Sequence, residues 1–457
     1  VIAPICERLC RHRWPGLSVL VITPTRALVN DLFHRLSRPL EQMGIRLGRK
    51  TADHGLPEQI SEQVVITTPE STESLLTFRR ETLDGIHAIV LDEIHLLDGS
   101  PRGDQLRSVL DRLSVYRHHI GGPEFSGLQR IAMSATVSNP TRLASVYLGH
   151  EAVIVAVPGQ RKLDARIILA NGMEKDGAEA VIAATAEFED VHKVLVFVNS
   201  RQQVDAGAAY LRCGRFASAP VYGHHGSLSK SEREETESRF KADAKAICVA
   251  TMTLEVGIDI GDIDLVVCMD PPFSLSSFLQ RIGRGCRRLQ GLTRVLCVAR
   301  NRAGELLFDA LIRQATCGVP AGPTPPFRRS VLLQQILAYL RQVSKNRRVV
   351  NQFVRVLGST AKPPISEECI KSVLSSMVQE NLLDYRSGIY QPASEGWSFI
   401  ESNKIYTNLQ PNPLEIALVD VDSGKTVVSV AAVLDGSGVR VAGRSYELLP
   451  GGSGMRR

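Results

Sequence analysis

The stretch His87-Ala88-Ile89-Val90-Leu91-Asp92-Glu93-Ile94-His95 is a short apolar run that ends in two acids and a histidine. Apolar runs of this length, rich in β-branched residues, are typical of strands buried on both faces of a parallel sheet. Similar runs occur at Val19-Leu20-Val21-Ile22, Val64-Val65-Ile66 and Arg130-Ile131-Ala132-Met133. The longer mixed segments between them fit helices, so residues 1–157 predict an α/β domain with a covered parallel sheet.

The same rhythm returns after the charged segment Gln160-Arg161-Lys162 and predicts a second α/β domain over residues 158–325. Its apolar runs are 194–198, 246–250, 265–269 and 295–298. From Pro323-Thr324-Pro325-Pro326 onward, amphipathic helices and a glycine-containing turn predict a winged-helix-like domain over residues 326–405. Alternating segments in residues 406–457 predict a small, partial β-domain.

Composition and charge bound the function without fixing it. The 457 residues are 44% hydrophobic and 22% charged, a globular balance that suits several domains. The net charge of +6 favours polyanionic partners. The 9 cysteines form no Cys-x-x-Cys pair, which indicates reduced core thiols rather than a metal or iron–sulfur site. Without a long apolar stretch or a signal-peptide layout, we expect a soluble cytoplasmic protein with no membrane partner.

Polar residues cluster directly after the predicted strands in both α/β domains. In open parallel sheets the carboxyl ends of the strands form the edge where ligands bind, so these clusters are expected to line one crevice. The clusters are Thr23-Pro24-Thr25-Arg26, Thr67-Thr68-Pro69-Glu70, Asp92-Glu93, Ser134-Ala135-Thr136, Asn199-Ser200-Arg201 and Thr251. Their shared position is stronger evidence for a site than any single motif.

Asp92 and Glu93 have a clear role in phosphoryl transfer. Asp92 would hold Mg²⁺ and Glu93 would polarise the attacking water, with His95 beside them. For these residues alone, an exposed acid pair at a strand end is the alternative interpretation. The ordered series that continues with Ser134-Ala135-Thr136 and with Gln280 to Arg287 instead indicates a nucleic-acid-stimulated ATPase.

The second domain offers cations for the other half of a nucleotide site. Arg284 and Arg287 lie three residues apart in a glycine-containing stretch, and both are candidates for arginine fingers on the γ-phosphate. Gln280, Gly257 and Asp259 would complete this half, with Asp259 accepting a hydrogen bond from the ribose or from the fingers. The alternative is a solvated basic helix face, because a further arginine follows directly.

Small polar side chains are expected to link the nucleotide site to a nucleic-acid track. Ser134 and Thr136 have short hydroxyls that would bond Asp92 or His95 and relay the nucleotide state, with an ordinary strand-end turn as the alternative. The track itself would grip phosphates rather than read bases, so no sequence specificity is expected. Its candidate residues are Thr25, Arg26, Thr68, Asn199, Ser200, Arg201, His225, Gly226 and Thr251. For Arg201 and His225 a simple loop role is the alternative.

No Gly-x-x-x-x-Gly-Lys-Ser/Thr loop precedes Asp92, although an ATPase of this kind needs one to cradle the phosphates. Ser423-Gly424-Lys425-Thr426 resembles the end of such a loop, but Val419 stands where its first glycine should be. That segment is predicted to be a hairpin turn. We therefore expect that the chain is cut just after the phosphate loop and is unable to hydrolyse ATP alone.

Several longer motifs between residues 24 and 288 add to this series. They are Pro24-Thr25-Arg26-Ala27-Leu28, Thr68-Pro69-Glu70, Asp92-Glu93-Ile94-His95, Gly99-Ser100-Pro101-Arg102-Gly103, Ser134-Ala135-Thr136, His224-His225-Gly226-Ser227-Leu228-Ser229, Thr253-Leu254-Glu255-Val256-Gly257-Ile258-Asp259-Ile260-Gly261 and Gln280 to Arg287. Together they resemble the superfamily 2 DEAD/DEAH-type ATP-dependent helicases, and within these the Lhr-like family of bacteria and archaea.

This resemblance implies two RecA-like lobes, use of ATP and Mg²⁺, and 3′ to 5′ translocation on single-stranded nucleic acid, with an association to DNA repair. The order of winged helix and β-domain is also similar to that of the family. Cys286 departs from the pattern, because the family commonly has glycine there. Val1-Ile2-Ala3-Pro4-Ile5 resembles the helix that follows the phosphate loop, so the resemblance implies a fragment.

Three functional hypotheses follow. The first is ATP-driven unwinding of, or translocation on, DNA or DNA–RNA hybrids. The second makes RNA the substrate, because contacts to 2′-hydroxyls cannot be predicted from these motifs. The third is a catalytically inactive clamp that binds single strands with strong salt dependence.

Overall fold

The computed structural model describes the chain in ranges separated by short gaps. The described residues are 1–12, 14, 16–56, 60–121, 127–134, 137, 139–149, 151–155, 162–170, 175–186, 190–211, 219–225, 228, 230–255, 260–272, 274–285, 292–317, 327–343, 345–358, 364–406, 416–420, 426–430, 439–441, 444–448 and 454–456. They divide into two compact units. The first comprises Val1–Thr68, Asp84–Asp98 and Gly127–Thr324, and the second comprises Pro69–Leu83, Gly99–Ser126 and Pro325–Arg457. Among the described residues, no helix has the length and apolar character needed to span a membrane.

The first unit contains a five-stranded parallel sheet with the order β2-β3-β1-β4-β5. Its strands are β1 (Val19–Ile22), β2 (Leu47–Lys50), β3 (Val64–Thr67), β4 (Ala88–Leu91) and β5 (Gln129–Ala132). Every residue of β1, β3 and β4 is buried, which explains why these strands are continuous apolar runs. Because β3 and β4 flank β1 on opposite sides, the strand order reverses there, and this is the position where such sheets bind ligands.

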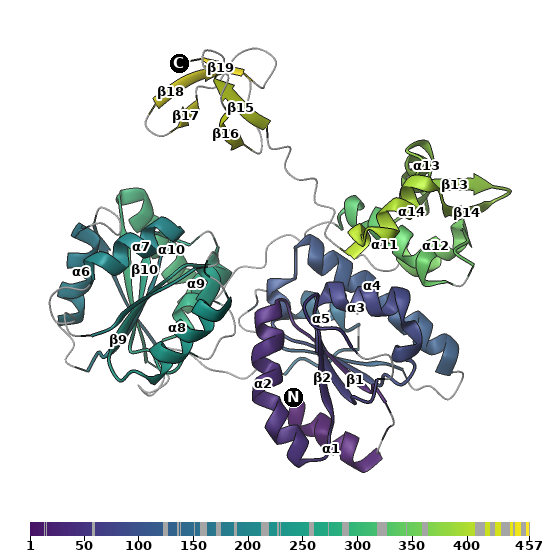
Figure 1. Cartoon of the computed structure of the whole chain (residues 1–457), viewed down its shortest axis with the longest axis horizontal. Coiled ribbons are helices and arrows are strands. Elements are labelled where there is room, and N and C mark those ends of the chain that lie inside the picture. The colour runs from purple at the N-terminus through teal and green to yellow at the C-terminus, as the bar shows by residue number, and fades with distance from the viewer. Residues whose placement is uncertain are drawn as a thin grey trace. The chain divides into compact units, whose positions relative to one another are not determined.

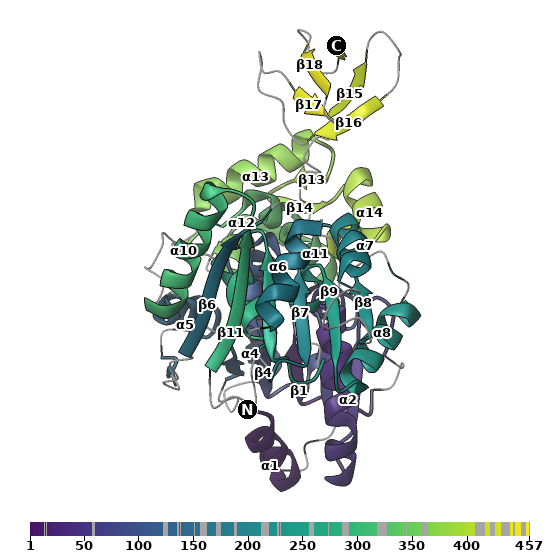
Figure 2. The same cartoon turned by 90° about the vertical axis from the view of Figure 1, so that its left-hand side faces the viewer.

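The first unit also contains a six-stranded parallel sheet with the order β6-β11-β10-β7-β9-β8 (Figure 2). Its strands are β6 (Lys162–Leu169), β7 (Lys193–Phe197), β8 (Val221–His224), β9 (Ala246–Ala250), β10 (Leu265–Met269) and β11 (Leu292–Ala299). Apart from the extra edge strand β6, the order of strands along the chain repeats that of the first sheet. The predicted pair of RecA-like parallel-sheet lobes is thus confirmed.

Helices cover both faces of the six-stranded sheet (Figure 1). Alternate residues of β7 point to opposite sides, as the strand period requires. Val194 and Val196 pack in the core with α6 (Lys175–Ala186) and α7 (Arg201–Tyr210). On the other face, Leu195 and Phe197 pack with aromatic residues of three helices, namely α8 (Lys230–Ala242), α9 (Leu275–Ile282) and α10 (Arg302–Cys317).

The remaining helices of the first unit belong to the first lobe. They are α1 (Ile2–His12), α2 (Arg26–Gln42) and α5 (Pro140–Tyr147), and a 3-10 turn, η2 (Ile94–Leu96), follows β4. On one face of the five-stranded sheet, Val19 and Val21 share a core with Ile5 of α1 and Val29 of α2.

The second unit joins helices that are distant in sequence. It contains α3 (Pro69–Phe78), η1 (Arg80–Leu83) and α4 (Pro101–Gly121), together with α11 (Arg329–Gln342), α12 (Val350–Leu357), α13 (Glu367–Gln379), α14 (Ser394–Glu401) and η7 (Lys404–Tyr406). A three-stranded antiparallel sheet, β12-β14-β13, completes the predicted winged-helix arrangement. Its strands are β12 (Arg348–Val349), β13 (Leu383–Arg386) and β14 (Ile389–Pro392).

A buried polar network explains why α3 and α4 group with α11. The guanidinium of Arg112 bonds to the Glu73 carboxylate at 2.5 Å, to Gln335 Oε1 at 2.9 Å and to Gln342 Oε1 at 2.8 and 2.9 Å. Arg112 and Glu73 are both fully buried. The predicted domain boundaries place α3 and α4 with the first lobe, whereas the compact units group them with the C-terminal helices.

Five further strands form a separate small sheet with the order β16-β15-β19-β18-β17 (Figures 1 and 2). They are β15 (Ile416–Asp420), β16 (Thr426–Val430), β17 (Val439–Val441), β18 (Arg444–Leu448) and β19 (Gly454–Arg456). Strands β15 and β16 pair antiparallel, as expected on either side of a hairpin turn. The predicted turn falls at residues 421–425, outside the described residues.

Candidate nucleotide site

The acid pair lies at the carboxyl edge of the first sheet. Asp92 directly follows β4, and its amide donates to the Ile22 carbonyl of β1 at 2.9 Å. Thr23 and Thr68 follow β1 and β3, the two strands that pair next to each other at this point. The strand register therefore brings three of the predicted polar clusters to one edge of the sheet.

Glu93 has a left-handed backbone, with φ 46° and ψ 43°. This conformation costs a non-glycine residue about 1–2 kcal/mol, so the surrounding structure must hold it in place. The holding contacts belong to η2: the Leu96 amide donates to the Glu93 carbonyl at 2.9 Å, and the Ile94 amide donates to the Met133 carbonyl at 3.2 Å. A strained residue at the carboxyl edge of a parallel sheet is a candidate functional residue.

Both carboxyl groups of the pair are shifted toward protonation. Burial and the neighbouring Glu93 charge raise the pKa of Asp92 to about 6. Burial also raises the pKa of Glu93, and the positive charge of Arg284 opposes that shift. Within the described part of the chain, no arginine or lysine forms an ion pair with Asp92. A partly buried carboxylate in this state suits a hard divalent cation such as Mg²⁺.

His95 connects the acid pair to two other predicted residues. Its Nδ1 lies 3.1 Å from Ser134 Oγ and 3.4 Å from Glu93 Oε2, and its Nε2 lies 3.1 Å from Gln280 Nε2. Burial lowers the pKa of His95, so the ring is neutral at physiological pH. The Gln280 amide nitrogen is a donor, so Nε2 of His95 accepts and Nδ1 carries the proton that it donates to Ser134.

The carboxyl edge of the second sheet is built around a buried ion pair. Arg281 Nε donates to Glu255 Oε1 at 2.7 Å, and the two side chains are 3% and 5% exposed. The other side of the guanidinium donates to Asn199 Oδ1 at 3.1 Å and lies over the Phe197 ring at 5.4 Å. Ser277 donates to the same Glu255 oxygen at 2.9 Å. These contacts fix α9, which carries Gln280.

Arg284 is held by the backbone of the same segment. Its Nε and Nη2 donate to the Glu255 carbonyl at 3.2 and 2.8 Å. Arg284 is close enough to Glu93 to influence the pKa of that carboxyl. Three predicted site residues, Arg284, Gln280 and Glu93, therefore lie near one another.

Glu255 and Arg281 were not among the site residues predicted from the sequence. Both lie inside the motifs that carried the family resemblance, but no local pattern links residues that are 26 positions apart. Opposite charges within otherwise apolar segments were the available signal, because charges buried in such segments are normally paired.

The predicted nucleic-acid residues of the second lobe have structural partners. Ser200 is the N-cap of α7 and forms a capping box with Gln203. Asn199 accepts from Arg281, as described above. Arg201 is the exposed first residue of α7, and Thr251 precedes the 3-10 turn η5 (Met252–Leu254) after β9. Nδ1 of His225 is buried without a hydrogen-bond partner among the described residues, so its ring retains an unused polar atom.

In the first lobe, Thr25 and Arg26 lie at the start of α2. Thr25 is its N-cap and accepts from the Leu28 amide at 3.3 Å. Arg26 is exposed and pairs with Asp53 at 3.1 Å. Thr68 is buried, at 5% exposure. Five predicted site residues, Thr136, Gly226, Gly257, Asp259 and Arg287, lie outside the described residues.

Two family models match the two lobes. The DEAD/DEAH box helicase model matches residues 1–143, and the helicase conserved C-terminal domain model matches residues 176–288. The Lhr helicase/uracil glycosylase of Escherichia coli (strain K12) is 30% identical over 397 residues, covering 72% of this chain and 25% of that protein. The ATP-dependent helicase Lhr-Core of Methanocaldococcus jannaschii is 30% identical over 300 residues, covering 60% of this chain and 34% of that protein. The chain thus spans between a quarter and about a third of these relatives.

Solved structures share the fold. The helicase Lhr of Mycobacterium smegmatis, bound to single-stranded DNA and AMP-PNP, matches with a TM-score of 0.67 and 23% identity over 85% of this chain and 55% of that chain. The DUF1998 helicase MrfA bound to DNA matches with a TM-score of 0.69 and 18% identity over 99% of this chain and 62% of that chain. With both helicase domain models matched and Lhr-type relatives at 30% identity, the chain belongs to the superfamily 2 helicases as a member of the Lhr-like family.

Proposed function

We propose that this chain supplies the two-lobed motor of an ATP-dependent helicase or translocase that acts on DNA or DNA–RNA hybrids in the 3′ to 5′ direction. The observation that carries the proposal is the acid pair Asp92-Glu93, held by a strained turn at the switch point of a parallel sheet. The electrostatic influence of Arg284 on Glu93 supports a role for the second lobe in the same reaction.

ATP and Mg²⁺ are the cofactors that these residues fit. Asp92 would hold Mg²⁺, which neutralises charge on the phosphates when it is bound. One carboxylate is enough, because Mg²⁺ sites of this class take their other ligands from phosphates and water. Arg284, together with Arg287, would stabilise negative charge that develops on the transferred group.

Glu93 would orient the attacking water and accept its proton. Its raised pKa makes its carboxylate a better proton acceptor than an exposed one at neutral pH. The neutral His95 would hold the side chains of Glu93 and Gln280 in fixed positions. Ser134 would relay the nucleotide state through the contact of its hydroxyl with His95. No residue in this set needs to change its protonation state except Glu93.

Nucleic acid would bind through small donors and a few cations rather than through base contacts. The candidates remain Thr25, Arg26, Thr68, Arg201, His225, Gly226 and Thr251, with Asn199 and Ser200 acting mainly through the backbone they position. The relative named above was solved with single-stranded DNA, which supports DNA as the first substrate to test.

The central test separates binding from hydrolysis. Because the 457 residues contain no phosphate-loop motif, we propose that they bind single-stranded DNA but do not hydrolyse ATP alone. A form of the protein that includes a phosphate loop should hydrolyse ATP faster when single-stranded DNA is added, and Glu93→Gln should abolish that turnover. Stimulated turnover by the 457-residue chain itself would contradict the requirement for a separate phosphate loop.

The competing hypotheses predict other results in the same assay. Stronger stimulation by RNA than by a matched DNA strand would favour an RNA helicase. Salt-dependent strand binding without turnover in the form that carries a phosphate loop would favour the inactive clamp.

A further inference from the structure

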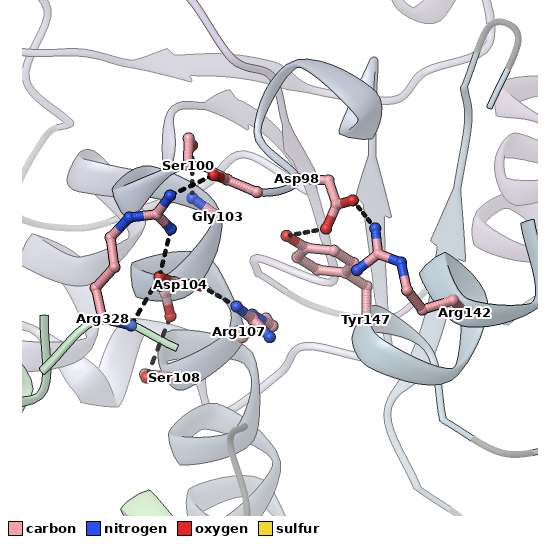
Figure 3. A network of polar contacts seen from close by, with 10 residues as sticks. Asp98, Ser100, Gly103, Asp104, Arg107, Ser108, Arg142, Tyr147 and Arg328 are labelled. Atoms are coloured by element: carbon pink, nitrogen blue, oxygen red, sulfur yellow. Dashed lines mark hydrogen bonds and ion pairs between the residues drawn. The ribbon is translucent and has the colours of Figure 1, made fainter. Parts of the chain in front are cut away.

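Arg328 contacts the segment that follows the acid pair in sequence (Figure 3). Its Nη1 and its backbone amide donate to Asp104 Oδ2 at 2.8 and 3.1 Å. Its Nη2 donates to the Gly99 carbonyl at 2.5 Å. Arg328 directly precedes α11, the first helix of the winged-helix domain. We call this set of three residues, Arg328, Gly99 and Asp104, the Arg328 clasp.

The side chain of Asp104 is fully buried, so its negative charge requires compensation by hydrogen-bond donors or cations. A second guanidinium, that of Arg107, also pairs with it, and Ser108 Oγ donates to its backbone carbonyl at 3.3 Å. A buried carboxylate with two cations and one amide is fully compensated, whereas removal of one partner leaves a costly charge. The clasp is therefore a strong contact within the second unit.

Gly99 is the point at which the chain passes from the first unit into the second. Its φ of 73° is the left-handed conformation that glycine adopts without strain. On the preceding side, Asp98 is tied to α5 through an ion pair with Arg142 and a 3.4 Å hydrogen bond from Tyr147 (Figure 3). On the following side, the chain is tied by Arg328. The peptide at Gly99 is thus anchored separately in each unit.

The path from Gly99 back to the acid pair is short and contains a hydrogen-bonded turn. Glu93 and Asp98 enclose a single 3-10 turn, in which the amides of Leu97 and Asp98 both donate to the Ile94 carbonyl at 3.0 Å. Glu93 itself is held in a left-handed conformation by the same turn. A shift of the Gly99 carbonyl would therefore pull on the turn that holds Glu93.

We infer that Arg328 is a positioning residue through which the winged-helix domain controls the turn that carries Glu93. This inference rests on the proposed function, because it assigns the clasp to the nucleotide site. The clasp itself is independent of that function and is tested separately.

Hydrogen exchange of the 457-residue chain tests the mechanical link without requiring ATP turnover. In Arg328→Ala, the amides of Leu96, Leu97 and Asp98 should exchange about ten to a hundred times faster, the range expected for loss of a hydrogen bond to a charged group. Amides of α5 and α13 should exchange at their original rates. Acceleration confined to residues 99–107 would overturn the inference, because it would show a local contact with no effect on the turn.

Two further variants make this result specific. Arg329→Ala removes the same charge from the neighbouring exposed position and should leave exchange at Leu96–Asp98 unchanged. Arg328→Lys replaces the planar fork by one ammonium while keeping the charge next to Asp104. In Arg328→Lys the exchange rates at Leu96–Asp98 should rise less than in Arg328→Ala, and the melting temperature should not change. This variant replaces Arg328→Ala as the test if Arg328→Ala does not fold. Original exchange rates in Arg328→Lys would overturn the inference in that case.

The functional link is tested in a form of the protein that carries a phosphate loop. Arg328→Ala should lower the DNA-stimulated kcat about tenfold while the KM for ATP and the affinity for single-stranded DNA stay the same. Arg329→Ala should keep the original kcat. A full kcat in Arg328→Ala would overturn the inference. If the unsubstituted protein shows no turnover, the proposed function fails, whereas the exchange result still decides whether the clasp controls the turn.

Discussion

The carboxyl edges of the two parallel sheets use the same strand order and satisfy their charges in opposite ways. At the first edge, Asp92 and Glu93 are partly buried, their pKa values are raised, and no arginine or lysine among the described residues forms an ion pair with Asp92. At the second edge, Glu255 is buried to a similar or greater degree but is fully paired with Arg281. The shared strand order thus brings side chains together at equivalent positions, whereas the charges of these side chains are paired at only one of the two edges.

From this contrast we propose different tasks for the two lobes. The first edge keeps two partly buried carboxyl groups whose pKa values are raised, which costs stability and is common at functional sites. The second edge is an ion-paired framework that fixes α9 and the Arg284 side chain, although Nη1 of Arg281 is buried without a hydrogen-bond partner among the described residues. In this proposal the first edge binds a cation, and the second presents cations to a ligand.

The largest expected effect breaks the framework of the second lobe. Arg281→Ala leaves Glu255 buried without its partner and should lower the free energy of unfolding by about 3–5 kcal/mol. Urea denaturation followed by circular dichroism measures this loss. Arg300→Ala is the matched control, because Arg300 pairs with Asp270 at the surface and should cost less than about 1 kcal/mol. Equal losses in the free energy of unfolding would show that burial does not make the Arg281 ion pair more important for stability than a surface pair.

The next effect concerns chemistry at the first edge. Glu93→Gln keeps the size of the side chain but removes the proton acceptor, so DNA-stimulated turnover should fall by about 10²–10⁴-fold in a form with a phosphate loop. Strand affinity, measured by fluorescence anisotropy, should not change. The control is Glu62→Gln, which alters a carboxylate of the same lobe that lies outside the acid pair. Turnover in Glu93→Gln close to that of the unsubstituted protein would remove Glu93 from the reaction.

Much of the first edge could be predicted from the sequence. The pairing of distant side chains could not, and the reason is physical. The strands β1, β3 and β4 appear as apolar runs because they are buried on both faces, and the acids directly after β4 mark its carboxyl end. Pairing between distant residues leaves no such local pattern. The bonds of Arg281 to Glu255 and of Arg112 to Gln335 could not be foreseen for this reason, and the second bond explains why α3 and α4 group with α11.

A smaller effect tests the cost of burying the Asp92 carboxylate. Asp92→Asn removes a charge that burial disfavours, so it should raise the free energy of unfolding at pH 7.5 by about 1–3 kcal/mol, given the pKa of about 6 in the folded chain. The sign follows from linkage: the folded state holds a proton that the unfolded state has lost between about pH 4 and 6, so the unsubstituted chain loses stability as pH rises through this window. Above about pH 7, one unit above the pKa in the folded chain, the difference should stay constant.

Thermal unfolding of both chains between pH 4 and 8 measures this dependence. The gain in Asp92→Asn should disappear near pH 4, where Asp92 is protonated in the folded chain. Asp53→Asn is the control, because Asp53 is an exposed partner of Arg26 and its substitution should give a small, nearly flat difference. A gain in Asp92→Asn that is independent of pH would mean that the charge of Asp92 is not its cause.

The smallest expected effect asks whether the two edges act together. His95 Nε2 and Gln280 Nε2 lie 3.1 Å apart, so His95→Ala and Gln280→Ala should each cost more alone than in the presence of the other. A double-mutant cycle by urea denaturation at pH 7.5 should give a coupling of about 0.5–1.5 kcal/mol, the net value of one hydrogen bond. At a pH low enough to protonate His95 the coupling should decrease, because protonation removes the acceptor at Nε2, and burial, which lowers the pKa of His95, moves that change to a lower pH than for an exposed histidine. Zero coupling at both pH values would mean that the acid edge and the arginine edge, although built on one strand order, are energetically independent in the chain without nucleotide.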